Sequence, residues 1–324
     1  MRRFTSSILA LSMITMGSVA ASAQVELKLG HAAPDTDLQQ NLSVYFADKV
    51  KERTNGAVIV KIFPHGLLGN DEQMITGVRS GIIDIEMSGL NNLNGLNPKV
   101  GALELPYMIQ TREHAYKVFD GKIGAELSVD FEKQGMKVLG YPENGFRNIT
   151  NSKRSVKEPK DVAGLRMRTN NSKPLNEMFA LLKANPQQIP VAELYTALET
   201  GVVDAQEHPI SITYSFKFYE VQKYLSLSQH SYSALIMIMN LKKFNALTPE
   251  QQQIILTTAK EAVDLQRKLS VEKEEGFITE MEKEGMKVER DVDIDAFQKA
   301  AMPTWDGYIK SYGDALIKEI EAAK

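Results

Sequence analysis

The strongest constraint on the fold is a pattern of short strands alternating with amphipathic helices, which occurs twice along the chain. Apolar residues recur every three or four positions in the helices, and the strands are short and rich in apolar residues. The first set comprises strands 25–29, 57–63 and 82–87 and helices 37–53 and 70–79. The second set comprises strands 165–169, 187–191 and 202–206 and helices 174–183 and 192–200. Alternating strands and helices form parallel sheets covered by helices, so the sequence predicts an α/β protein with two similar domains.

A long helix-forming segment follows an apolar strand expected at 233–240. Its start carries Thr-Pro-Glu-Gln at 248–251, a capping box with proline at the first helical position. A helix over 249–284 would contain 36 residues and extend about 54 Å if straight, whereas one small domain is only about 30 Å across. We therefore expect a helix that runs along both domains. Gly276 leaves two versions open, one straight helix or a helix bent at this residue.

The first 23 residues have the features of an export signal. Arg2 and Arg3 precede an apolar stretch over 8–20, and Ala-Ser-Ala at 21–23 is a pattern that a signal peptidase cuts. A transmembrane anchor is disfavoured because the stretch is shorter than the about 20 residues that span a bilayer. No Cys follows the small residues, which excludes a lipid anchor there. The sequence therefore predicts a signal peptide at 1–23 and a periplasmic mature protein.

Size and charge narrow the possible functions of the mature chain. Removal of 23 of the 324 residues leaves 301, a length at which a single core usually divides into two domains. Loss of Arg2 and Arg3 takes Lys+Arg from 38 to 36 against 41 Asp+Glu, a formal charge of −5. A mildly acidic protein lacks the basic face of a nucleic-acid binder. The absence of Cys excludes disulfides, thiolate metal sites and thiol catalysis.

Motifs of catalysis and of metal binding are missing from the sequence. The five His residues show no HExxH spacing, and there is no GxSxG or GxxxxGK[ST] segment. The acidic stretch 291–295 lacks the glycine and terminal glutamate of a calcium loop. We therefore expect neither an enzyme nor a metal or cofactor site. A secreted hydrolase, the rival class, would need a nucleophile and base that no pattern indicates.

Arginines near strand ends are the best candidates for binding a ligand. Arg168 ends the predicted strand 165–169, and ligands of open α/β sheets lie beyond the carboxyl ends of strands. A guanidinium group matches a carboxylate with two parallel hydrogen bonds. Arg166 projects to the same side of that strand, so position alone leaves both open. Arg147 precedes a polar stretch, and His208 is either a donor to a ligand or a loop histidine bonded to backbone.

Several segments occur in an order that is specific in combination. They include Leu-Gly-His at 29–31, Thr-Asn-Gly at 54–56, Pro-His-Gly-Leu-Leu-Gly at 64–69, Gly-Phe-Arg at 145–147, Thr-Asn-Ser-Lys-Arg at 150–154, Asp-Val-Ala-Gly-Leu-Arg-Met-Arg at 161–168, and 193–209, which ends in Gln-Glu-His-Pro. Together they span essentially the whole mature chain. The chain resembles the substrate-binding proteins of TRAP transporters, the DctP-like family.

This resemblance implies a two-domain periplasmic-binding-protein fold with hinge strands and a long helix spanning both domains. The lobes are expected at 24–145 plus 234–273 and at 146–233 plus 274–324. They would close on a small organic anion, and the loaded form would be recognised by the TRAP membrane subunits, driven by an ion gradient. The resemblance also implies a monomer.

The resemblance also assigns roles to individual residues. It implies that Arg168, rather than Arg166, binds the ligand carboxylate, and that Arg147 is a second arginine of the cleft. His208 replaces an asparagine that is usual in the family, which indicates an altered specificity element. Sialic-acid-binding members carry an aromatic residue where this chain has Val191, which argues against sialic acid. The expected cleft positions of the N-terminal lobe are His31, Ala32, Asp71, Gly89 and Asn92.

The ligand class follows less directly from the sequence. A sugar acid, such as a uronate or an aldonate, is expected first, because polar side chains of the N-terminal lobe could hold hydroxyl groups. A C4-dicarboxylate is the alternative, since two arginines suit two carboxylates equally well; a keto or hydroxy acid is a further one. A sensor module for a membrane receptor would share the fold.

Overall fold

The computed structural model describes residues 24–324, so the predicted signal peptide at 1–23 lies outside the described residues. The strands are β1 (Val25–Gly30), β2 (Val58–Phe63), β3 (Ile85–Gly89), β4 (Met136–Gly140), β5 (Glu143–Asn151), β6 (Arg166–Thr169), β7 (Asn185–Gln188), β8 (Ala205–Pro209), β9 (Tyr224–Asn240) and β10 (Lys287–Glu289). They are joined in the order β2-β1-β3-β9-β5-β8-β6-β7, with β4 and β10 paired to β9. The protein is a mixed α/β fold, as predicted.

Helices cover both parts of this strand system. They are α1 (Leu38–Arg53), α2 (Asp71–Ser80), α3 (Lys99–Leu103), α4 (Arg112–Asp120), α5 (Lys122–Glu132), α6 (Lys173–Leu181), α7 (Val191–Glu199), α8 (Ile210–Ser215), α9 (Leu241–Asn245), α10 (Pro249–Lys283), α11 (Ile294–Ala301), α12 (Pro303–Tyr312) and α13 (Ala315–Ala322). The 3₁₀ helices of residues 24–324 are η1 (Leu90–Leu93), η2 (Pro159–Val162) and η3 (Phe218–Glu220).

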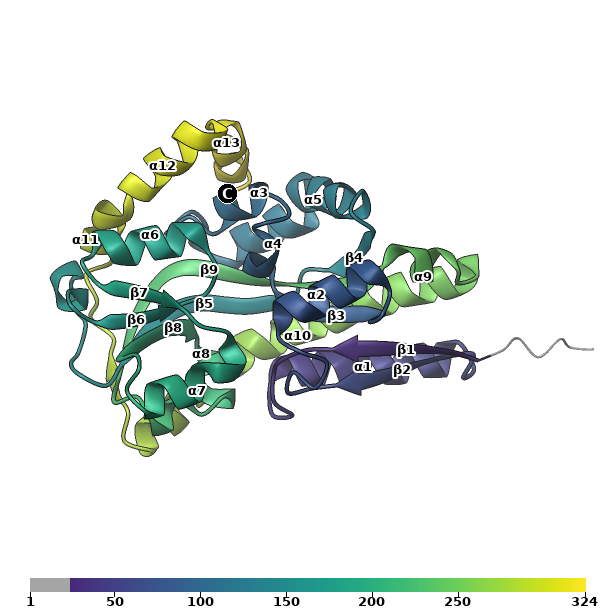
Figure 1. Cartoon of the computed structure of the whole chain (residues 1–324), viewed down its shortest axis with the longest axis horizontal. Coiled ribbons are helices and arrows are strands. Elements are labelled where there is room, and N and C mark those ends of the chain that lie inside the picture. Colours follow the sequence, from purple (N-terminus) through teal and green to yellow (C-terminus); the bar gives the residue numbers. More distant parts are fainter. Residues whose placement is uncertain (1–23) are drawn as a thin grey trace, which may run out of the picture.

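Two groups of strands lie at the two ends of the molecule, and β5 and β9 connect them (Figure 1). In the first half, β1 pairs in parallel with β2 and β3. In the second half, β6 pairs in parallel with β7 and β8. The long strand β9 runs antiparallel to β3 and β4 in the first half and to β5 in the second. The two predicted β-α-β sets therefore form one half each.

Local sequence signals set the start of α1 and both ends of α2. Asp37 caps α1 by accepting a hydrogen bond from the Gln39 main-chain N–H. Asn70 and Gln73 form a capping box at the start of α2. That helix ends at Gly81, whose φ of 82° lies in the left-handed region that favours glycine. These signals fix the position of the chain just after β1 and before β3.

The long helix α10 is continuous through Gly276. Ile255 and Ala259 pack in the core around α1, β1 and β2. Ile278 and Met281, further along the same helix, pack with Leu225 of β9 in the second half. The prediction of a single helix that contacts both halves is therefore confirmed. Within residues 24–324, even this helix is too polar to cross a bilayer, and no other helix meets the length and hydropathy needed.

The limits of the two lobes stay a prediction, but the C-terminal helices bear on them. Helices α11 to α13 arch from the second half back to α3 (Figure 1). Ile317 and Ile320 of α13 belong to the same core as α3, α4 and α5. His114 of α4 has its Nε2 2.7 Å from the Ile320 carbonyl oxygen. This packing favours a lobe boundary in which the last helix returns to the N-terminal half, whereas the sequence placed 274–324 in the C-terminal lobe.

Two strands begin later than predicted. Strand β3 starts at Ile85 rather than at 82, and β8 covers Ala205–Pro209 rather than 202–206. The apolar residues that favoured an early start, Ile82 and Val202, lie in exposed turns, with 72% and 51% of their surface accessible. The segment Gln-Glu-His-Pro at 206–209 is therefore part of a buried strand and does not follow one. Because of this shift, His208 lies inside a buried strand and not in the loop that the sequence indicated.

Candidate ligand-binding cavity

A cavity of about 280 Å³ lies between the two halves, where strand ends and helix starts meet. Eight of the nine residues predicted from the sequence line it. They are Arg147, Arg168, His208, Ala32, Asp71, Gly89, Asn92 and Val191. The ninth, His31, is fully buried outside the lining, with its Nε2 2.9 Å from the Gln40 Oε1 on α1. The ring of His31 contacts α1, and its neighbour Ala32 takes the position at the cavity wall.

Arg168 lies at the carboxyl end of β6 with only 3% of its surface exposed. Its Nε donates to the Ile189 carbonyl oxygen at 2.8 Å, and its Nη1 lies 3.2 Å from His208 Nε2. Three of its five N–H groups have no partner within the described part of the chain. Burial lowers the pKa of Arg168 to about 10, with Glu207 opposing this effect. The guanidinium group is therefore charged at neutral pH and only partly hydrogen-bonded.

The structure separates Arg168 from Arg166. The two side chains share one face of β6, but Arg166 lies at the start of the strand, where its guanidinium group pairs with Asp204 at 2.7 and 2.9 Å. Its side chain is 43% exposed, and it does not line the cavity. Because β6 runs toward the cavity, only the residue near its carboxyl end reaches the cavity wall.

Arg147 lines the same cavity but has a carboxylate partner. Its Nη2 donates to Glu207 Oε1 at 2.8 Å and to the Glu207 carbonyl oxygen at 2.6 Å, and its Nε donates to Glu207 Oε2. Burial alone would raise the pKa of Glu207, but the charge of Arg147 and hydrogen bonds from His230 and Arg147 lower it to about 2. Arg147 is thus half of a buried ion pair, whereas Arg168 has no carboxylate partner among the described residues.

His208 lies within β8, and both of its ring nitrogens face side chains. Nδ1 is 2.5 Å from Gln206 Oε1, and Nε2 faces Arg168 Nη1. Burial, together with the positive charges of Arg168 and Arg147, lowers the pKa of His208 well below its usual value. The backbone-bonded alternative does not match this geometry, because both ring nitrogens face side chains, and a direct contact of His208 with a ligand stays a prediction.

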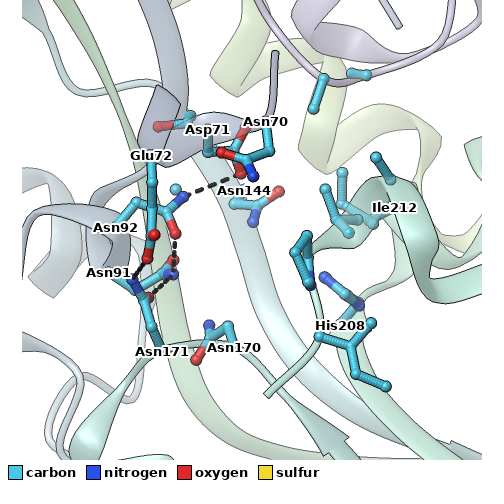
Figure 2. Close-up of a pocket in the computed structure, with 18 of the residues that line it drawn as sticks. Asn70, Asp71, Glu72, Asn91, Asn92, Asn144, Asn170, Asn171, His208 and Ile212 are labelled. Atoms are coloured by element: carbon cyan, nitrogen blue, oxygen red, sulfur yellow. Dashed lines mark hydrogen bonds between the residues drawn. The ribbon is translucent and has the colours of Figure 1, made fainter. Parts of the chain in front are cut away.

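The opposite wall of the cavity consists mainly of amide and acidic side chains, on the α2 start and the η1 turn (Figure 2). Asn92 Nδ2 donates to Asp71 Oδ2 at 3.1 Å. Burial raises the pKa of Asp71 to about 6, although the Asn92 hydrogen bond and the charge of Arg168 lower it. Gly89 precedes η1, and a side chain there would collide with Asn91 Oδ1 at 2.3 Å from its Cβ. This wall offers donors and acceptors suited to hydroxyl groups.

Side chains from the two halves meet at the cavity rim. Asn91 Nδ2 donates to Asn171 Oδ1 at 2.8 Å, and Asn171 Nδ2 donates to Glu72 Oε1 at 3.1 Å. On another side, Ser215 Oγ of α8 donates to Asp37 Oδ2, the cap of α1, at 2.6 Å. These hydrogen bonds join segments far apart in the sequence and hold the halves together around the cavity.

Sequence reasoning missed most of the amide groups in the lining. They are Gln39, Asn70, Asn91, Asn144, Asn170, Asn171 and Gln188, with Glu72 beside them. A usable signal was present for three of them, because Asn91 lies two residues after the end of β3 and Asn170 and Asn171 directly follow β6, at strand ends where ligands bind. Asn144, inside β5, had no such signal. Among the described residues, no group of three or more His, Cys, Asp or Glu could hold a metal ion.

Comparison with known proteins agrees with this architecture. The family model for bacterial extracellular solute-binding proteins, family 7 (DctP), matches residues 29–311. The 2,3-diketo-L-gulonate-binding periplasmic protein YiaO of Escherichia coli is 45% identical over 294 residues, which are 90% of this chain and 88% of that protein.

Two solved structures share the fold closely. A TRAP periplasmic solute-binding protein from Polaromonas, bound to D-erythronate, has a TM-score of 0.90 and 34% identity over 93% of this chain and 99% of its own. The sugar acid binding protein of Advenella mimigardefordensis, in complex with galactonate, has a TM-score of 0.89 and 30% identity over 93% and 99%. The chain therefore belongs to the DctP family, the family 7 solute-binding proteins of TRAP transporters.

Proposed function

We propose that this solute-binding protein captures a sugar acid with one carboxylate in the periplasm and delivers it to TRAP membrane subunits. The observation that carries the proposal is the incomplete hydrogen bonding of Arg168. Its guanidinium group is buried in the cavity between the two halves, and three of its N–H groups have no partner among the described residues. A buried cation without a paired carboxylate is costly unless an anion completes its environment. A ligand carboxylate would supply that anion.

The hydrogen bonds of Arg168 support a defined orientation of that carboxylate. Its Nε is already bonded to the Ile189 carbonyl oxygen. A two-point contact with a carboxylate therefore uses the Nη1 and Nη2 end of the fork, because the Nε side has a partner. The opposite wall, with Asp71, Asn91 and Asn92, then faces the rest of the ligand. Hydroxyl groups both donate and accept, so they match this mixture of carboxylate and amide groups.

Relatives support the sugar-acid class. Several solved structures with this fold hold sugar acids, among them D-erythronate, galactonate and galacturonate, and the relative from Escherichia coli is named for 2,3-diketo-L-gulonate. Each of these compounds combines one carboxylate with several hydroxyl or keto oxygens. The 45% identity to the diketogulonate-binding protein makes 2,3-diketo-L-gulonate the first compound to test.

A C4-dicarboxylate is the second candidate, because a relative from Bacillus subtilis, 29% identical, is named as a C4-dicarboxylate-binding protein and one neighbouring structure holds succinate. The pairing of Arg147 with Glu207 argues against it here. A second carboxylate would find the Arg147 charge already neutralised and the Asp71 carboxyl group on the opposite wall.

Capture is proposed to proceed by closure of two lobes, at 24–145 plus 234–273 and 146–233 plus 274–324, with the last helix assigned by its packing to the first. Only the closed state can contact a ligand from both sides, so binding shifts the equilibrium toward closure. The contacts of Asn171 and Ser215 across the cavity rim support this motion, because they can form only when the halves are together. The protein would act as a monomer that docks on the membrane subunits.

A thermal-shift screen of purified residues 24–324 tests the proposal. The panel contains 2,3-diketo-L-gulonate, aldonates, uronates, succinate and the matching neutral sugars. A sugar acid at a hundredfold excess over its dissociation constant should stabilise the protein by about 2.7 kcal/mol. Stabilisation by succinate alone would favour the dicarboxylate alternative. Stabilisation by neutral sugars alone would rule out a carboxylate-binding role for Arg168.

A further inference from the structure

His208 belongs to a chain of buried hydrogen bonds that begins at Gln222 and ends at Arg168. Thr150 Oγ1 is 3.1 Å from Gln222 Oε1 and 2.7 Å from Gln206 Nε2. Gln206 Oε1 is 2.5 Å from His208 Nδ1, and His208 Nε2 is 3.2 Å from Arg168 Nη1. Each of these side chains is at most 6% exposed. Of the five residues, only the last two line the cavity.

The far end of the chain fixes the direction of its hydrogen bonds. Gln222 Nε2 lies 3.1 Å from the Val221 carbonyl oxygen and 3.4 Å from that of Asp204, and carbonyl oxygens only accept. The Gln222 Oε1 therefore faces Thr150 and accepts its hydroxyl proton. The Thr150 oxygen in turn accepts from Gln206 Nε2, which turns Gln206 Oε1 toward the histidine. The atom of Gln206 that faces His208 Nδ1 is thus an acceptor.

The near end fixes the same direction independently. A guanidinium group can only donate, so the His208 Nε2 that faces Arg168 must carry a lone pair. A neutral imidazole with a lone pair on Nε2 carries its proton on Nδ1, the atom that faces the Gln206 acceptor. The alternative tautomer would oppose two donors at Arg168 and two acceptors at Gln206. Both ends therefore require one protonation state.

We propose that His208 is a positioning residue for Arg168, held as a neutral Nδ1–H tautomer by the relay from Gln222, and that it acts on the ligand through Arg168. This inference rests on the proposed function of Arg168 as the carboxylate-binding group. With Ile189 O at Nε and His208 Nε2 at Nη1, two acceptors set the plane of the guanidinium group before a ligand arrives. Preorganisation of this kind reduces the ordering cost of binding.

The same geometry gives His208 a role in selecting where the carboxylate lies. A carboxylate oxygen is repelled by the lone pair on Nε2, so it cannot take the histidine as a donor. It is directed instead to the N–H groups of Arg168 that remain without a partner among the described residues. A donor at position 208 would attract a carboxylate oxygen and compete with Arg168.

Nuclear magnetic resonance of the ligand-free protein tests the tautomer without any ligand. Protein labelled with ¹⁵N-histidine gives distinct signals for protonated and unprotonated ring nitrogens, and the His208 signals are assigned by their loss in His208→Gln. At neutral pH, we expect a neutral ring with its proton on Nδ1. A proton on Nε2, or a doubly protonated ring, would overturn the inference.

A double-mutant cycle tests whether His208 acts through Arg168. His208→Leu removes the acceptor and should weaken binding of the best sugar acid of the screen about tenfold to a hundredfold, the range for hydrogen bonds to charged groups. In the Arg168→Ala background the same change should alter affinity less than about twofold, because the residue it positions is gone. Equal effects in both backgrounds, or no effect in the wild type, would contradict the proposal.

Two further variants keep the test decisive. His208→Gln retains an oxygen that can accept from Arg168 and should stay within about fivefold of wild-type affinity, since one good acceptor is kept. Thr150→Val breaks the relay outside the cavity lining, and it replaces His208→Leu if that variant fails to fold. It should weaken binding and raise the Nε2–H population; unchanged values of both would count against the relay. If the wild type binds no carboxylate at all, the proposed function fails, while the resonance experiment still decides the tautomer.

Discussion

Arg147 and Arg168 line one cavity, but their hydrogen-bond partners differ in charge. Arg147 donates to the Glu207 carboxylate, whereas the side-chain partners of Arg168 among the described residues are the Ile189 carbonyl oxygen and the His208 Nε2. Two residues that look alike in the sequence therefore differ in charge balance. The charges of Arg147 and Glu207 balance each other in this ion pair. His230 Nε2 lies 3.3 Å from Glu207 Oε2. The positive charge available to a ligand is the one on Arg168.

Replacement of Arg168 by alanine should lower the affinity for a sugar acid by at least a hundredfold. Removal of one partner of a buried ion pair typically costs about 3–5 kcal/mol. Arg168→Lys should also bind weakly, because an ammonium group lacks the planar fork. Isothermal calorimetry measures both variants, with Arg166→Ala as the matched control on the same strand face. Near-wild-type affinity in Arg168→Ala would contradict the assignment.

Replacement of Glu207 by glutamine should mainly lower stability. It leaves Arg147 as a buried cation without its carboxylate, at a cost of about 3–5 kcal/mol in the free energy of unfolding. Urea unfolding measures this loss. Glu261→Gln, which breaks the solvent-accessible ion pair with Arg53, is the control and should cost far less, because solvent screens an exposed ion pair. Equal losses of unfolding free energy in the two variants would show that the buried Arg147–Glu207 pair stabilises the fold no more than an exposed ion pair does.

The lowered pKa of Glu207 also predicts a pH dependence of stability. Its pKa is about 2 in the folded protein against the usual 4.5. An acid with a depressed folded-state pKa stabilises the fold above its unfolded value, and this contribution is lost as the pH falls from about 4.5 toward 2. Urea midpoints between pH 6 and 2.5 should show a steeper loss for the wild type than for Glu207→Gln, which has no proton to take up at this site. Parallel curves would be the opposite result.

Asp71 should couple sugar-acid binding to proton uptake. Its pKa is raised by burial to about 6, against the opposing effect of Arg168. A bound carboxylate would offset the charge of Arg168 and raise this pKa further, so binding takes up a proton and strengthens as the pH falls from about 7.5 toward 6. Calorimetry in two buffers of different ionisation enthalpy measures the uptake. Asp71→Asn should abolish it; uptake that persists in this variant would place the titrating group elsewhere.

Asn171 should slow the release of a bound ligand. Its side chain joins the halves through Asn91 and Glu72 at the cavity rim. Asn171→Ala removes two hydrogen bonds of about 0.5–1.5 kcal/mol each, which should raise the dissociation rate roughly fivefold or more while the association rate changes little. Stopped-flow displacement measures the rates. Gln253→Ala, an exposed change on α10, is the control, and an unchanged dissociation rate in Asn171→Ala would mean that these bonds do not hold the closed state.

The sequence predicted the features that depend on local rules. Alternating patterns of apolar residues indicated the two sets of strands and helices, the capping box at 248–251 placed the start of α10, and the rule that ligands lie beyond strand ends pointed to Arg168. Predictions at strand boundaries were less accurate, because apolar turn residues such as Ile82 and Val202 resemble strand residues in the sequence.

What the sequence determined by itself was the alternation that makes an α/β protein, the length of its long helix, and the arginine at the end of a strand. Only the tertiary structure decided that Arg147 is neutralised by Glu207, sixty positions away, and that His208 Nε2 lies beside the Arg168 guanidinium group. The reason is that hydropathy patterns and caps are set by neighbours in the chain. The partner of a buried charge is set by the pairing of strands from distant segments.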